Sequence, residues 1–117
     1  MSPEDRHRVE AFVLLKDAPA DIGRHLADAS TIQVLAPDAT LFAAGERPSF
    51  LHLILAGRIA LIGESAGDTA VVEAFGEGEA LLTPAVVLDL PYLLTARALI
   101  ETRVAAIPAA AFRTLLD

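Results

Sequence analysis

The side chains of this sequence that could do chemistry fall into two sets, clustered carboxylates and scattered histidines. Glu73, Glu77 and Glu79 surround a glycine turn, where a calcium site would need more ligands at tighter spacing. We interpret them as a solvated acidic rim. The histidines stand on different expected elements and form no His-x-His pair: His7, His25 and His52. The sequence therefore predicts no metal site.

Patterns for nucleophilic catalysis and phosphate chemistry are missing as well. Ser49 and Ser65 lie in turns near proline or glycine, and the sequence has no Gly-x-Ser-x-Gly elbow. It also has no cysteine and no Walker-type glycine-rich loop. We assign no catalytic residue and expect a protein that is not an enzyme.

The stretch from residue 75 to residue 99 has the outline of a loop that cradles a ligand between two strands. It reads FGEGEALLTPAVVLDLPYLLTARAL and opens with two acidic residues among glycines. Apolar residues follow, interrupted by two prolines and a tyrosine, so the loop holds few charges with which to bind a ligand. Such a loop needs a scaffold that the rest of the chain must supply.

Length and composition limit that scaffold to one domain, residues 1–117. A chain of this size can bury a single core without disulfides. The net charge of −7 and the single lysine, Lys16, disfavour nucleic-acid binding through this chain alone. No apolar run reaches the roughly 18–20 residues that cross a bilayer, and the charged N-terminus does not resemble a signal peptide. We expect a cytoplasmic protein that makes no membrane contact.

Residues 1–30 predict a helical lead-in of two short helices. Ser2 is suited to cap the first helix, and Pro3 to occupy its first position. A second helix start follows at Ala18–Asp21, and Ser30 ends that helix.

Residues 31–107 predict short strands separated by turns. Apolar segments recur about every 8–12 residues between Gly, Pro and Asp, and the sequence SAGD joins two of them as a hairpin. A short helix over Pro84–Asp89 interrupts the strands, and residues 108–117 begin a C-terminal helix. The expected strands are TIQVLA, TLFAA, FLHLILA, RIALIGE, TAVVEAF, LLTARALI and RVAAI. This order predicts a mainly β fold, a double-stranded β-helix (jelly roll) with flanking N- and C-terminal helices.

An ordered set of segments within this pattern resembles a known family. Thr40–Glu46 ends in a Gly-Glu turn. In Phe50–Leu61 an apolar strand runs to Gly57 and leads into another strand. Phe75–Glu79, Pro91 and the apolar positions of Ala109–Leu115 continue the match over most of the chain. Together they resemble the cyclic-nucleotide-binding domain of Crp/Fnr (catabolite-activator-like) regulators, without the helix-turn-helix domain. The resemblance implies a sensor domain of the cyclic-nucleotide-binding type.

The resemblance also assigns pocket positions. In the family a glutamate binds the ribose and an arginine neutralises the cyclic phosphate, helped by backbone N–H groups at the start of a short helix. The pocket positions matched here are Gly78, Leu82, Thr83, Pro84, Ala85, Pro91, Tyr92, Leu93 and Leu94.

Two of these matches change the chemistry of the phosphate-binding cassette. Leu82-Thr83 stands where the family has Gly-Glu, and Tyr92 stands where it has arginine, the nearest arginine in sequence being Arg97. A cyclic phosphodiester in a half-buried pocket needs a guanidinium and oriented donors. We therefore expect tight binding of cyclic AMP or cyclic GMP to be lost. Backbone donors at Pro84–Val86, the hydroxyl of Thr83 and the phenol of Tyr92 could instead hold a neutral ligand.

Three hypotheses about function follow from the matched cassette. The first is a ligand-sensing domain with altered recognition, in which Tyr92→Arg with Thr83→Glu would restore nucleotide binding. The second is a dimerisation or partner-binding module whose pocket is filled by leucines and which exposes an apolar surface. Those leucines are Leu82, Leu93 and Leu94. The third is a small-molecule enzyme on the same barrel.

His52 raises the question of a haem cofactor, because some members of the resembled family carry haem in this barrel. A histidine is a plausible axial ligand. The general interpretation favours a partly buried histidine at a strand edge that makes one hydrogen bond. We therefore expect no cofactor.

Overall fold

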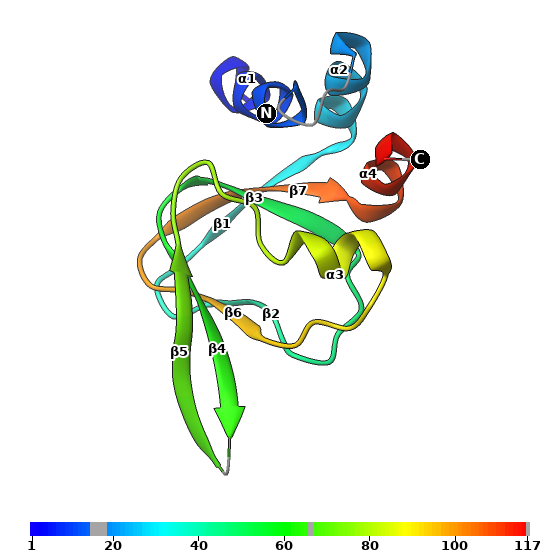
Figure 1. Ribbon diagram of the computed structural model, residues 1–117. Helices are drawn as coiled ribbons and strands as arrows, with labels where there is room; N and C mark the ends of the chain where they lie inside the picture. The colour runs from blue at the N-terminus through cyan, green and yellow to red at the C-terminus, as the bar shows by residue number, and fades with distance from the viewer. Residues whose placement is uncertain (15–18, 66, 117) are drawn as a thin grey trace.

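A computed structural model describes residues 1–14, 19–65 and 67–116 of the chain. Two helices, α1 (Pro3–Leu14) and α2 (Ala20–Ala29), precede the strands, α3 (Thr83–Leu88) interrupts them and α4 (Ala109–Leu116) follows them. Figure 1 shows α1, α2 and α4 gathered at one end of the molecule, with both termini. Ala18 and Ala66, which belong to the expected second helix start and the expected hairpin turn, lie outside the described residues.

The start of α1 and the end of α2 follow from local capping. The Oγ atom of Ser2 accepts a hydrogen bond from the Asp5 backbone N–H at 3.1 Å, as its position before Pro3 predicts. Ser30 ends α2, and its backbone N–H donates to the carbonyl of Ala27 at 3.2 Å. The two-helix lead-in is therefore present as the sequence predicts.

The strands form two antiparallel sheets that enclose the core. One sheet has the order β1-β7-β3 and the other the order β2-β6-β4-β5. The strands are β1 (Thr31–Leu35), β2 (Thr40–Phe42), β3 (Phe50–Ala56), β4 (Ile59–Ser65), β5 (Asp68–Phe75), β6 (Thr95–Ala98) and β7 (Thr102–Pro108). This is the expected mainly β jelly roll with flanking helices.

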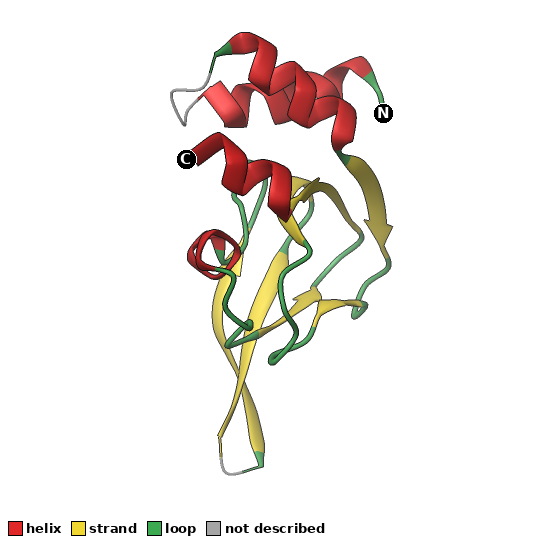
Figure 2. Cartoon of the chain, turned by 90° about the vertical axis from the view of Figure 1, so that its right-hand side faces the viewer, coloured by secondary structure: helices red, strands yellow, loops and turns green. Residues whose placement is uncertain are grey.

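The three terminal helices cover one sheet, and a long hairpin leaves the other. α1 and α4 contact β3, and α2 and α4 contact β7. Figure 2 shows the helices stacked above the barrel, with the β4–β5 hairpin extending away from them. The core between these layers includes Val9 from α1, Leu26 from α2 and Phe112 from α4. The molecule is accordingly elongated, with principal extents of 47 × 29 × 18 Å.

The sixth strand is shorter than its apolar sequence predicts. We expected a strand over LLTARALI, but β6 covers only Thr95–Ala98. The residues before it pair with the turn between β2 and β3 instead. Tyr92 donates its backbone N–H to the carbonyl of Glu46 at 2.9 Å and accepts from the N–H of Gly45 at 2.8 Å. These bonds fix residues 91–94 as an irregular segment beside α3.

None of the helices within the described ranges has the length and apolarity that a membrane crossing requires.

Candidate functional site

The cassette segment (residues 76–94) is anchored to β3 by backbone hydrogen bonds. Gly78 donates its N–H to the carbonyl of Ile54 at 2.8 Å, and Leu81 donates to the carbonyl of His52 at 3.0 Å. Gly78 has a φ of +86°, a conformation that glycine adopts without strain. The family's glycine is therefore matched by a glycine that turns the chain onto the sheet.

The N-terminus of α3 offers fewer backbone donors than the sequence predicts. Leu82 adopts the left-handed conformation (φ 48°, ψ 46°) before the helix begins. Its carbonyl accepts the N–H groups of Ala85 at 3.1 Å and Val86 at 3.3 Å. Pro84 has no N–H. The donors expected over Pro84–Val86 are therefore already bonded or absent, which corrects that expectation.

The side chain of Tyr92 turns into the core. Its side chain is 3% exposed and stacks on Phe42, with ring centroids 3.8 Å apart and planes inclined by 14°. Its hydroxyl donates to the carbonyl of Phe50 at 3.2 Å. Burial, and secondarily the nearby Glu46 carboxylate, raises the pKa of Tyr92 to about 12. The phenol is thus engaged inside the barrel by its hydrogen bond to Phe50.

The three leucines matched to the pocket do not act together. Leu82 and Leu94 are partly buried and pack against the core. A Cβ atom placed on Gly63 of β4 would come within 3.3 Å of both Leu94 and Val72, so Leu94 fills the space beside the β4–β5 hairpin. Leu93 is 87% exposed. The expectation that all three fill the pocket is therefore wrong for Leu93.

Two arginines near the cassette, Arg113 and Arg47, bind other parts of the chain. Arg113 of α4 donates to the carbonyl of Val86 at 2.7 Å and pairs with the Asp89 carboxylate at 3.3 Å. Arg47 donates to the carbonyl of Asp89 at 2.8 Å. Arg97 is exposed on β6, between the buried Ala96 and Ala98, and so faces away from the barrel interior. Asp89 thereby joins α3 to α4 and to the β2–β3 turn, a role that the sequence did not suggest.

His52 is buried deeper than expected, and its ring is not satisfied. It is 6% exposed, and its Nδ1 atom is buried without a hydrogen-bond partner. Burial lowers the pKa of His52 from 6.5 to about 4, so the ring is neutral at pH 7. The expected single hydrogen bond is therefore missing at Nδ1. His52 lines a cavity of about 240 Å³, which is below the roughly 300 Å³ of pockets for drug-sized ligands.

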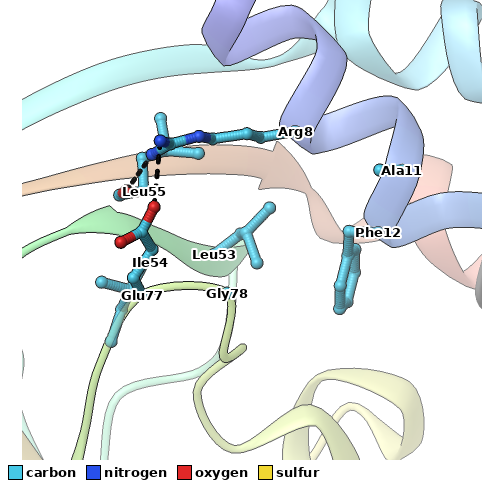
Figure 3. Close-up of a pocket in the computed structure, with 8 residues that line it drawn as sticks. All are labelled: Arg8, Ala11, Phe12, Leu53, Ile54, Leu55, Glu77 and Gly78. Carbon is cyan, nitrogen blue, oxygen red and sulfur yellow. Dashed lines mark hydrogen bonds and ion pairs between the residues drawn. The ribbon is translucent and has the colours of Figure 1, made fainter.

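A second cavity lies between α1 and β3, on the opposite side of the sheet from the barrel interior. It has a volume of about 230 Å³ and is lined by Leu53, Phe12 and the aliphatic part of Arg8, among others. Figure 3 shows Arg8 reaching from α1 to Glu77 of the cassette segment, where the ion pair measures 2.9 Å. Arg8 also donates to the carbonyl of Leu55. The acidic rim expected from the sequence is therefore partly neutralised by α1.

Exposed apolar residues gather around α3. Leu88, Leu90 and Leu93, here called the leucine patch, are 64%, 52% and 87% exposed. With Pro84, Ala85 and Pro91 they line a hollow of about 400 Å³ whose walls are largely apolar. Leucines this exposed in one group are typical of an interaction surface.

These features agree with the comparison to protein families. The model of the cyclic nucleotide-binding domain matches residues 32–117, from β1 to the C-terminal helix. The chain belongs to the cyclic nucleotide-binding domain family. No curated protein matches the sequence.

Solved structures of this family superpose on the chain. A candidate cAMP-binding regulatory protein from Silicibacter pomeroyi has a TM-score of 0.83 and 23% identity over 94% of this chain and 53% of that one. A cyclic nucleotide-binding-like protein from Brucella abortus has a TM-score of 0.80 and 26% identity over 96% and 97%. The sensor domain of the transcriptional regulator DNR from Pseudomonas aeruginosa has a TM-score of 0.85 and 18% identity over 99% and 80%. The chain thus spans about half the length of the first relative.

We predict that Tyr92→Arg destabilises this domain without restoring a nucleotide site. The arginine would replace a buried ring that stacks on Phe42, at a cost of about 3 kcal/mol in the free energy of unfolding. The matched control, Tyr92→Phe, keeps the stack and loses one hydrogen bond, which costs about 1 kcal/mol. Urea unfolding of both variants measures the difference. Equal stability, together with cyclic AMP binding by Tyr92→Arg or by its double mutant with Thr83→Glu, would contradict the prediction.

We also predict that His52 makes the domain less stable in mild acid. The folded-state pKa of about 4 lies below the unfolded value of 6.5, so the unfolded chain takes up the proton first as the pH falls. Between pH 6.5 and pH 4 this lowers the free energy of unfolding by about 3 kcal/mol. Urea unfolding across this range should show the loss in the wild type and not in His52→Phe. A His7→Phe variant, changed at an exposed helix position, should keep the wild-type slope.

Proposed function

We propose that this chain is a non-catalytic regulatory sensor domain of the Crp/Fnr type whose cassette does not bind cyclic AMP or cyclic GMP tightly. In this proposal it forms part of, or derives from, a transcriptional regulator and works in the cytoplasm. Family membership and the likeness to the DNR sensor domain support the regulatory role. The chain itself contributes no DNA-binding surface in this proposal, consistent with its net charge of −7.

The observation that carries the proposal is the place of Tyr92. The position matched to the family's phosphate-binding arginine holds a phenol that stacks on Phe42 inside the core. Ala85 and Val86, which could supply backbone donors, are bonded to the carbonyl of Leu82. A charged hydrogen bond contributes about 1.5–3 kcal/mol, so losing the guanidinium and these donors together reduces affinity by several hundredfold or more.

A second candidate function, a dimerisation module, rests on the leucine patch. Leu94 fills space beside the hairpin, while Leu88, Leu90 and Leu93 stand in solvent around an apolar hollow. An exposed apolar surface of this kind favours an interaction role. In this alternative the partner is a second copy of the chain, and the patch covers itself in the dimer.

We predict no measurable binding of cyclic AMP or cyclic GMP by calorimetric titration up to about 1 mM ligand, because no matched group neutralises the phosphate. The non-cyclic nucleotide 5′-AMP is the control for unspecific heat. A dissociation constant in the micromolar range for either cyclic nucleotide, with none for 5′-AMP, would overturn the proposal.

For the alternative, we predict that serine at Leu88, Leu90 and Leu93 shifts the domain from dimer to monomer in sedimentation-velocity runs at about 100 µM. The three side chains are exposed, so the monomer should keep its stability. Serine at Leu99 and Ile100, which are 44% and 50% exposed in the β6–β7 turn, is the matched control and should leave the dimer unchanged. A wild-type chain that is monomeric throughout this concentration range would rule the alternative out.

A further inference from the structure

The β4–β5 hairpin carries an uncovered sheet edge. β5 is the last strand in the order β2-β6-β4-β5, so among the described residues no strand pairs with its outer side. Figure 1 shows the hairpin projecting from the barrel, and β5 is exposed at every residue from Asp68 to Glu73. The backbone N–H and C=O groups along this outer side are therefore open to an added strand.

The other sheet edges are shorter or covered. β1 has five residues and β2 has three, whereas β5 has eight. The outer side of β3 is occupied by the cassette segment, because Ile54 donates its N–H to the carbonyl of Glu79 at 3.0 Å and accepts from Gly78 at 2.8 Å. Proteins commonly keep edge strands short or cover them, since a long free edge pairs with other chains. β5 is thus the edge best suited to strand addition.

Two valines on β5 are unusually exposed for apolar side chains. Val71 is 60% exposed and Val72 is 61% exposed. The pairing with β4 passes from Val71 directly to Glu73, so Val72 is the extra residue of a β-bulge. A regular edge therefore runs from the bulge toward the hairpin turn, with Val71 at its inner end. β-branched side chains favour contacts across paired strands, which Val71 lacks on its outer side.

The charged residues of the hairpin are all acidic. They are Glu64 on β4 and Asp68 and Glu73 on β5, and neither strand contains a lysine or an arginine. All three are exposed, and within the described part of the chain none of them forms an ion pair. The edge would therefore attract a cationic strand and repel an anionic one.

A second copy of the chain fits this edge poorly. Two β5 strands paired edge to edge would bring Asp68 and Glu73 of both copies onto one ribbon that contains no cation. Like charges brought together across strands destabilise the pairing. The carboxylates thus oppose self-pairing and leave the edge open to a strand of opposite charge.

We propose that the outer edge of β5 binds an extended, cationic segment of a partner protein by strand addition. Backbone hydrogen bonds supply the affinity, and Val71 packs against an apolar residue of the added strand. Lysine or arginine side chains beside Asp68 and Glu73 supply the selectivity. This inference does not depend on the loss of nucleotide binding or on the leucine patch, because β5 contains no residue of the cassette or of that patch.

The test titrates the ¹⁵N-labelled domain with the peptide acetyl-KVTVKVTK-amide at a low salt concentration of about 50 mM. The NMR signals of Asp68–Glu73 should shift, with a dissociation constant of about 0.1 mM. The peptide acetyl-EVTVEVTE-amide keeps the strand propensity with the opposite charge, and it should bind at least about tenfold more weakly. The peptide acetyl-KVPVKVPK-amide keeps the charge, but its prolines interrupt the ladder of hydrogen bonds, so it should also bind at least about tenfold more weakly.

A matched pair of variants tests the role of the hairpin charge. Glu73→Lys should weaken the basic peptide a few-fold and strengthen the acidic one. Glu101→Lys makes the same charge change at an exposed position of the β6–β7 turn, and it should leave both affinities unchanged. Both positions are exposed, so both variants should fold.

Several outcomes would overturn the proposal. They are no binding of the basic peptide, shifts confined to residues outside β5, equal binding of the proline peptide, and a Glu73→Lys variant that behaves like Glu101→Lys. Signals of β5 that move when the domain alone is diluted would identify a second copy as the occupant, and would overturn it as well.

Discussion

The interaction on which the rest of this domain depends is the stack of Tyr92 on Phe42. It joins the segment after α3 to β2, and the backbone of Tyr92 is bonded on both sides to the Gly45-Glu46 turn. The stack buries a large apolar surface inside the barrel. Because the phenol occupies this place, the residue matched to the family's phosphate-binding arginine is part of the core, and its ring also lines the cavity that contains His52.

A second constraint links the cassette to the helix that follows the barrel. Asp89 ends α3 in a left-handed conformation with φ 53° and contacts both Arg47 and Arg113. Arg113 also bonds the carbonyl of Val86, so α3 is tied to α4 through main chain and side chain. The ion pairs are partly exposed, so the hydrogen bonds to carbonyls are expected to contribute more than the Coulomb attraction. The position of α3 is thus fixed by the elements around it.

Local signals were sufficient to predict most of the fold. Ser2 and Ser30 bound the helices where capping chemistry places them, and the strands fall on the apolar segments between turn residues. The site was predicted less well, because the match assigned Tyr92 and Leu93 to a pocket by position alone. Which way each side chain points depends on the irregular backbone of residues 91–94, and that backbone is set by hydrogen bonds to a turn some 46 residues earlier in the chain.

The sequence by itself determined the family, the order of the elements and the missing arginine of the cassette. These follow from residue types at fixed separations, which are local properties. Only the tertiary structure decided that Tyr92 is a core residue, that Leu93 is exposed while Leu94 is packed, and that His52 is buried with Nδ1 unpaired. The physical reason is that burial and hydrogen bonding of a side chain depend on which strands and turns surround it, and those neighbours come from distant parts of the chain.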